Sequence, residues 1–300
     1  MSISDFFKNL FNKNSTKCSE ERKINEELKE AIKKLSKNEI VLDFSENEVK
    51  EYSSKIGGKP FLPKDFNWPT YKSYEDNITR PLSFFCQINL EEVSKYDLDN
   101  LLPKSGMLYF FYECESMTWG FDPKDNGAAR VFYYKDTEGF MSVDLPDDLE
   151  TIIPELAIIF SNRNSYPMFE EFEYYDNLEC DFEDYDNSLE SLGVNLDEDG
   201  IYKLLGYANI IQNEMLSQCE RVKRGLYCGD SESYVNTPQE VKEEIDKCAK
   251  EWILLFQLST IETSDFEWMF GDLGYLYFYI LKSDLENENF ENIQFVVQCY

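Results

Sequence analysis

Residues 106–112 read GMLYFFY, and residues 274–280 read GYLYFYI. Gly, Leu, Tyr and Phe recur in register in these two segments. In both segments the two alternating faces carry apolar side chains, which is typical of a strand that is covered on both sides. Each segment therefore predicts a central strand, and we expect both strands to belong to one continuous body.

Further strand-like segments match on either side of these two. One precedes each central strand and contains Gln87 or Gln257, and another follows it. The matching order favours an internal duplication, although aromatic strands also resemble one another through their restricted composition. The segments are FFCQIN (84–89) and ARVFYYK (129–135) in the first half, and LLFQLS (254–259) and IQFVVQCY (293–300) in the second.

The sequence thus predicts an α+β fold with a mainly antiparallel β body made of two related (duplicated) β-rich halves, and with helices at the N-terminus and between the halves. We expect an N-terminal helical segment at 1–38, followed by an α+β domain at 39–300. The halves of that domain would span about 39–168 and 200–300, and the end of the first, from 136 to about 168, is predicted as helix or loop. An acidic insertion at about 169–199 would separate the halves.

The predicted insertion is a dense acidic tract. Residues 170–199 hold thirteen carboxylates and no Lys or Arg. Like charges at this density repel one another, which predicts a loop or a weakly ordered segment. Aromatic residues such as Phe172 and Tyr185 are interleaved with the acids, which indicates that part of the tract docks on this protein or on a partner.

Composition excludes several classes of function. With 59 acidic and 29 basic residues the formal charge is −30, so direct binding to nucleic acid or to anionic membranes is disfavoured. A basic protein, a polyamine or a divalent ion remains compatible, and so does a solvated surface without a partner. The absence of histidine removes the Ser/His/Asp triad, the Cys/His dyad and mixed Cys/His zinc sites.

No cofactor is evident from the motifs. Neither GxGxxG nor GxxxxGK occurs, and no CxxC pair is present. No signal peptide and no apolar run of transmembrane length is visible, so we expect a cytoplasmic protein with reduced thiols. Residues 1–13, MSISDFFKNLFNK, have helical apolar spacing, which predicts a peripheral membrane or partner anchor or, alternatively, a helix that docks on the body.

The loop with the most distinctive chemistry lies between two of the predicted strands. Trp119, Asp122, Asp125 and Arg130 fall within twelve residues around glycines. An Asp122–Arg130 pair beside Trp119 is suited to bind a charged small molecule or an arginine of a partner. The alternative is a turn locked by an aspartate cap and an ion pair. If the halves are related, a groove between them would be lined by Asp122 and Asp272.

A second candidate site is a partial calcium loop. Asn195, Asp197 and Asp199 place oxygen ligands at alternate positions, and Gly200 follows. The bidentate glutamate of such a loop would fall at 206, where this chain has Gly206. Asp197 and Asp199 are therefore weak metal candidates, and otherwise no metal site is predicted.

The chain resembles the YwqG-like family, a bacterial family of unknown function, over roughly residues 40–300. The resemblance implies a soluble, compact α+β fold, supplies no catalytic residues, and implies a role as an immunity protein in some toxin loci. The acidic tract is longer than the family pattern. The motifs that carry the resemblance are GGKPFLPKDFNWP (57–69), PLSFFCQINL (81–90), LLPKSGMLYFFY (101–112), WGFDPKDNGAARVFYY (119–134), LLGYANIIQ (204–212), WILLFQLS (252–259), FGDLGYLYFYI (270–280) and FENIQFVVQCY (290–300).

Two classes of function are consistent with these observations. The first is a protein-interaction module whose acidic surface binds a basic partner, with an association rate that falls as salt is added. The second is a small-ligand-binding protein or metal-dependent enzyme with a carboxylate site between the halves. The sequence favours binding over catalysis.

Overall fold

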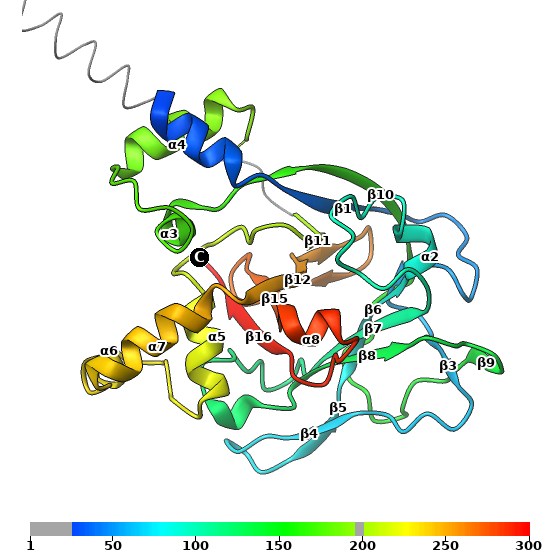
Figure 1. Cartoon of the computed structure of the whole chain (residues 1–300). Helices are drawn as coiled ribbons and strands as arrows, with labels where there is room; N and C mark the ends of the chain where they lie inside the picture. The colour runs from blue at the N-terminus through cyan, green and yellow to red at the C-terminus, as the bar shows by residue number, and fades with distance from the viewer. Residues whose placement is uncertain (1–25, 196–200) are drawn as a thin grey trace, which may run out of the picture. The chain divides into compact units, whose positions relative to one another are not determined.

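Figure 1 presents the protein as a computed structural model, which describes residues 26–195 and 201–300. The chain forms two compact units. Among the described residues, one unit contains 26–36 and 166–195, and the other contains 37–165 and 201–300. The structure therefore groups the N-terminal segment with the acidic tract, whereas the sequence analysis treated them as separate regions.

The smaller unit is helical. Residues 26–34 form a helix, and the acidic tract contributes α3 (Phe169–Phe172) and α4 (Phe182–Ser191). The prediction of a loop is therefore wrong for the parts of the tract that form α3 and α4. Burial explains the difference, because Phe172 and Tyr185 pack with Leu28 of the first helix and this apolar contact offsets the repulsion between the acids. Asp181 caps α4 by accepting a hydrogen bond from the backbone N–H of Asp184 at 2.8 Å.

The larger unit is built on one ten-stranded sheet whose neighbouring strands are antiparallel. The prediction of a mainly antiparallel α+β fold is confirmed. All six strands expected from the apolar patterns are present. In spatial order the sheet contains β16 (Gln294–Gln298), β15 (Tyr275–Leu281), β12 (Trp252–Leu258), β11 (Lys203–Leu205), β1 (Lys37–Ser45), β10 (Leu156–Ser165), β2 (Lys55–Ile56), β6 (Ser83–Asn89), β7 (Met107–Tyr112) and β8 (Ala129–Tyr134).

The centre of the sheet is the pair β1 and β10, which runs in register from Lys37 opposite Ser165 to Ser45 opposite Ala157. The region that holds β10 was predicted as helix or loop, and that prediction is wrong. The apolar signal is weak here because Ser161, Asn162 and Arg163 occupy one stretch of β10 and much of the strand is exposed. Pairing with β1 therefore fixes this strand more than burial does.

Corresponding contacts occur on the two sides of the central pair. Gln87 is fully buried; it accepts a hydrogen bond from the backbone N–H of Phe61 and donates to the carbonyl of Ser53. The facing Tyr109 donates to the carbonyl of the same Phe61. In the other part of the sheet Gln257, Tyr277, Asn209 and Ile201 make the same set of contacts.

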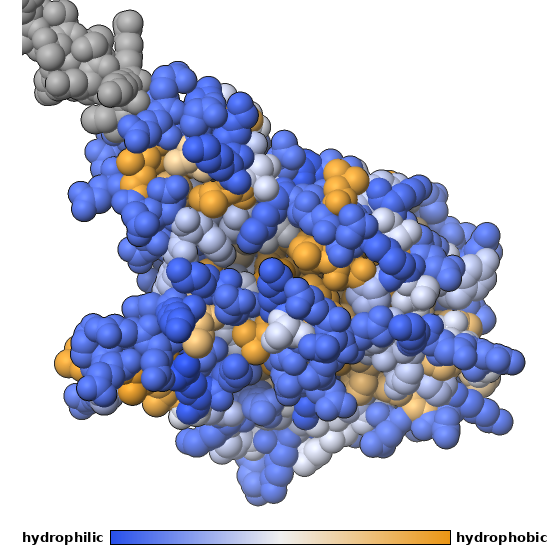
Figure 2. Space-filling view, viewed as in Figure 1, coloured by the Kyte–Doolittle hydropathy of each residue, from blue (hydrophilic) through white to orange (hydrophobic). Residues whose placement is uncertain are grey.

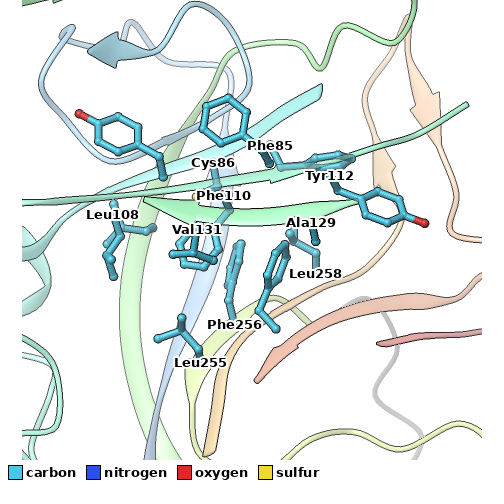
Figure 3. Close-up of a cluster of buried hydrophobic side chains, with 14 of the residues drawn as sticks. Phe85, Cys86, Leu108, Phe110, Tyr112, Ala129, Val131, Leu255, Phe256 and Leu258 are labelled. Carbon is cyan, nitrogen blue, oxygen red and sulfur yellow. The ribbon is translucent and has the colours of Figure 1, made fainter. Parts of the chain in front are cut away.

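Strands near the two ends of the sheet face each other across the main core. Phe110 of β7 lies 4.5 Å from Phe256 of β12 and 5.2 Å from Phe278 of β15, measured between ring centroids. Figure 3 shows Phe110 and Phe256 pointing toward one another in this cluster. Burial of such aromatic surface is the main driving force for closing the sheet on itself.

Short elements surround the sheet. Three two-stranded sheets are the hairpin of β4 (Thr70–Lys72) with β5 (Thr79–Pro81), the hairpin of β13 (Ile261–Glu262) with β14 (Glu267–Trp268), and the long-range pair of β3 (Phe61–Pro63) with β9 (Phe140–Ser142). The helices are α2 (Leu90–Val93), α5 (Leu216–Lys223), α6 (Ser231–Val235), α7 (Gln239–Ala249) and α8 (Lys282–Glu286). Helix α5 packs on α7 and on strands β12 and β16.

Hydrophilic residues cover most of the face seen in Figure 2. No helix within the described part of the chain is both long enough and apolar enough to cross a membrane. Residues 1–13, predicted as an anchor or a docking helix, lie outside the described residues.

Candidate functional site

An open pocket of about 780 Å³ lies in the larger unit, beside the loop that follows β7. It is formed by three segments that are distant in sequence: the tip of the β4–β5 hairpin, the loop at 116–125, and the turn after α5. The lining residues are Tyr74, Glu75, Ser116, Met117, Thr118, Trp119, Phe121, Asp122, Pro123, Lys124, Asp125, Gly225 and Tyr227. Three of the predicted site residues, Trp119, Asp122 and Asp125, are therefore brought together here.

Backbone contacts hold the pocket loop against β16. The carbonyl of Trp119 accepts a hydrogen bond of 3.0 Å from the N–H of Val297. Gly120 follows with φ of +81°, and a Cβ atom at this position would lie 2.1 Å from the carbonyl oxygen of Phe295. Since such an approach is impossible for a side chain, glycine is required here. The contacts of Trp119 and Gly120 with β16 thus fix the position of the indole in the pocket wall.

Asp122 and Asp125 form a reciprocal cap around the short 3-10 helix Pro123–Asp125. The side chain of Asp122 accepts a hydrogen bond from the N–H of Lys124 at 2.9 Å. In return, Oδ2 of Asp125 accepts hydrogen bonds from the N–H groups of Gly120 and Asp122, at 2.9 and 3.4 Å. The predicted aspartate cap is confirmed. Asp125 therefore fixes the loop conformation as well as contributing its charge.

Asp125 is in an unusual electrostatic environment. Its side chain is almost fully buried, and this burial raises the pKa of Asp125 to about 6, although the N–H groups of Gly120 and Asp122 favour the carboxylate. The neighbouring phenol of Tyr74 is affected in turn. Burial, and then the charges of Asp125 and Asp122, raise the pKa of Tyr74 to about 12. Perturbed groups of this kind in a pocket are typical of functional sites.

The cation next to Asp122 is a lysine, not the predicted arginine. Lys124 Nζ lies 3.9 Å from Oδ2 of Asp122 and 5.2 Å from the centroid of the Tyr74 ring. Arg130 is exposed on β8, does not line the pocket, and forms no salt bridge with any residue that the structure describes. The predicted Asp122–Arg130 pair is therefore wrong. Lys124 is two residues from Asp122 on the same turn, so its ammonium group lies beside the carboxylate, whereas Arg130 lies on β8.

Asp272 is exposed and is not part of the pocket lining. Its carbonyl accepts a hydrogen bond from the N–H of Tyr300 at 3.1 Å. The adjacent Gly271 backs onto the Trp119 ring, so Asp272 lies behind the pocket wall. The metal candidates Asp197 and Asp199 lie outside the described residues. Within residues 26–195 and 201–300, no cluster of three or more acidic or thiol side chains is arranged to hold a metal ion.

Sequence reasoning missed part of the pocket. Tyr74 and Glu75 come from a hairpin more than forty residues before the loop, and Tyr227 comes from a turn about a hundred residues after it. The ring of Tyr227 meets that of Phe121 edge to face, with 5.7 Å between centroids. Nothing in the local pattern of these segments signals a pocket. Their contribution depends on the closure of the sheet.

A family model described as a domain of unknown function, DUF1963, matches residues 54–299. The chain belongs to the DUF1963 family. The match includes β2 and extends through β16, so it covers the whole pocket of this DUF1963 protein. A comparison with curated proteins finds no match.

Proposed function

We propose that this DUF1963 protein is a binding module that recognises a basic partner protein, and that the pocket beside residues 116–125 anchors a cationic group of that partner. The observation that carries the proposal is the composition of the pocket. Three carboxylates, those of Glu75, Asp122 and Asp125, line it together with aromatic rings, against one lysine, Lys124. Carboxylates and aromatic faces both attract cations.

The charge of the whole chain supports the same proposal. A formal charge of −30 attracts a basic partner over long distances, raises the association rate and makes binding sensitive to salt. The thirteen carboxylates of 170–199 add to this field. In this proposal the acidic surface accelerates encounter, and the pocket supplies the specific contact.

The proposal is tested with fluorescently labelled basic peptides and with their charge-reversed counterparts. At 20 mM salt we expect the basic peptides to bind, the acidic ones not to bind, and the affinity of the basic peptides to fall at least tenfold by 300 mM. Neutralising the exposed carboxylates of 170–199 should slow association more than it speeds dissociation. If basic peptides fail to bind at low salt, the proposed function is wrong.

A small-ligand-binding protein or enzyme is the second candidate. It is favoured by the raised pKa of Asp125, about 6, since catalytic carboxylates are commonly tuned toward neutral pH. The same pocket would serve this function. Turnover of a small cationic substrate that stops in Asp125→Asn would favour this candidate over the binding module.

Two further parts of the proposal concern origin and role. We propose that the two parts of the sheet arose by duplication, since the Gln–Tyr contacts around Gln87 and Gln257 are matched on either side of β1 and β10. The YwqG-like resemblance and the immunity role that it implies stay predictions. A basic toxin would fit the proposed class of partner.

A further inference from the structure

Two buried oxygen atoms of the pocket accept no hydrogen bond of ordinary geometry from the described residues. They are Oδ1 of Asp125 and Oγ1 of Thr118, and the hydroxyl of Tyr74 lies close enough to the Asp125 carboxylate to interact with it. The side chains are 3% and 6% exposed, and both residues line the pocket. A buried polar atom without a partner costs about 1–3 kcal/mol. Two such atoms in one pocket indicate a place for a ligand that donates hydrogen bonds.

Aromatic rings form much of the remaining lining. Trp119, Phe121 and Tyr227 come from the loop and from the turn after α5, and Tyr74 comes from the hairpin tip. The electron-rich faces of such rings attract cations, and they attract planar, weakly hydrated cations best. The pocket therefore combines acceptors for N–H groups with surfaces on which a flat cation stacks.

The protein already holds one cation at the edge of this pocket. Lys124 Nζ lies between the carboxylate of Asp122, at 3.9 Å, and the ring of Tyr74, at 5.2 Å from its centroid. The side chain of Lys124 is 68% exposed, so the contact is loose and readily replaced. Lys124 marks a position that favours positive charge, and an incoming cation would compete with it.

We propose that the pocket binds the guanidinium group of an arginine side chain, which donates to Asp125 Oδ1 and Thr118 Oγ1 and displaces Lys124 from Tyr74. This inference rests on the proposed function and names the group that the basic partner contributes. A guanidinium offers five N–H donors in a plane and stacks on aromatic rings, whereas an ammonium is compact and strongly hydrated. A quaternary ammonium has no N–H and would leave both oxygens unpaired.

The size of the pocket is consistent with a side chain that belongs to a larger partner. A volume of about 780 Å³ exceeds what one guanidinium fills and leaves space for the residues next to the arginine. The pocket is open on one side of the larger unit, so a chain can pass across its mouth.

The test uses four peptides that differ at one central position: arginine, citrulline, lysine or trimethyllysine. Citrulline has nearly the shape of arginine without its charge. Affinities are measured by calorimetry at pH 7.5, above the pKa of Asp125, which is about 6. We expect arginine to bind at least tenfold more tightly than citrulline, and severalfold more tightly than lysine or trimethyllysine.

Variants locate the interaction. Asp125→Asn should weaken the arginine peptide at least tenfold, and Thr118→Val should weaken it about threefold to tenfold, in line with loss of one hydrogen bond. Lys124→Gln removes the competing cation and should strengthen the arginine peptide about threefold. This gain cannot result from misfolding. Asp43→Asn removes the same charge from an exposed side chain of β1 and should leave the affinity within twofold.

The outcomes separate the two proposals. If all basic peptides bind in a salt-sensitive way but arginine and citrulline bind equally, the arginine pocket is overturned and the binding function stands. If arginine binding is unaffected by Asp125→Asn and by Lys124→Gln, the arginine site lies elsewhere and the inference is again overturned. If no basic peptide binds, both proposals fail.

Discussion

The carboxylate of Asp125 accepts a hydrogen bond from the backbone N–H of Gly120 at 2.9 Å, which ties the end of the pocket loop to its middle. Gly120 in turn backs directly onto Phe295 of β16. The acid that carries charge into the pocket is thus also the group that holds the loop in shape. Stability and binding should therefore respond to the same residues, and their contributions can be separated by pH and by matched variants.

Replacing Asp125 by Asn should change how stability depends on pH. Burial raises the pKa of Asp125 from 3.8 to about 6, so the folded state keeps a proton that the unfolded state has released. The contribution of this group to the unfolding free energy falls as pH rises toward 6 and is constant above it. The unfolding free energy of Asp125→Asn, taken relative to that of the wild type, should rise by about 1 kcal/mol from pH 5 to pH 7. Urea unfolding at both pH values measures this difference.

Thr118→Val is the control for that experiment, because it alters the same pocket without removing a titrating group. Its effect on the unfolding free energy should be equal at pH 5 and pH 7. Measurements start at pH 5 since the sequence pI is about 4.3. A pH-independent difference between Asp125→Asn and the wild type would show that Asp125 titrates normally.

Gly120→Ala should destabilise the protein more than Gly139→Ala. Both glycines have positive φ, +81° and +79°, but a Cβ at 120 would collide with the carbonyl of Phe295, whereas a Cβ at 139 meets nothing within 4 Å. Gly139→Ala should therefore show only the backbone cost, about 1 kcal/mol. Gly120→Ala should add at least another 1–2 kcal/mol, because the loop must move from β16. Equal shifts of the denaturation midpoints would refute the tight packing at 120.

Gln87→Leu and Gln257→Leu should destabilise the protein to a similar extent. Each amide is fully buried and satisfies backbone groups of the chain that crosses it. Leucine would leave those groups unpaired, which lowers the unfolding free energy by about 2–4 kcal/mol. The exposed Gln239→Ala on α7 should stay within about 0.5 kcal/mol of the wild type. Chemical unfolding of the three variants gives the comparison, and a large effect at only one of the two buried positions would argue against equivalent roles.

Lys203→Met should cost more stability than Lys55→Met. Lys203 pairs with Glu39 at 2.7 Å with both side chains 3% exposed, whereas Glu155, the partner of Lys55, is 42% exposed. Burial opposes the charge of Glu39, but Lys203 and Arg163 overcome it and hold the pKa of Glu39 below its usual value. Removing Lys203 leaves that carboxylate poorly compensated and should lower the unfolding free energy at pH 7 by about 3 kcal/mol.

Glu155 can recover its hydration, so we expect Lys55→Met to cost about 1 kcal/mol or less. The contribution of Glu39 is present above pH 4.5, its usual pKa, and is lost as pH falls through its lowered value. The difference between the two variants should therefore shrink at acid pH. A constant difference would mean that packing of the lysine stems, and not the ion pair, is responsible.

Much of the sheet was predictable because the local apolar pattern of its strands is clear. The runs around Phe110 and Phe278 are apolar on both faces, and burial on both faces leaves little choice other than a central strand. The same reasoning failed for β10 and for the acidic tract. In β10 polar residues interrupt the apolar pattern. In the tract the density of acids predicted a loop, but burial of Phe172 and Tyr185 against Leu28 offsets the charge repulsion.

The candidate site was predictable only in its central loop. The composition of 119–125, with Trp119, two aspartates and a glycine, identified three lining residues. Arg130 was predicted to be in the site because it is close in sequence. In the structure its side chain lies on the exposed face of β8, between the buried Ala129 and Val131. The tyrosines that complete the pocket, Tyr74 and Tyr227, come from distant segments without any local signal.

The sequence by itself determined the strands, the negative charge and the absence of histidine chemistry, because these follow from local apolar patterns and from composition. The tertiary structure decided which strands are neighbours, that the N-terminal helix packs with the acidic tract, and which side chains meet in the pocket. The physical reason is that a pocket is a relation between segments far apart in the chain. Their meeting depends on core packing, as where Phe110 packs against Phe256, and not on any local pattern.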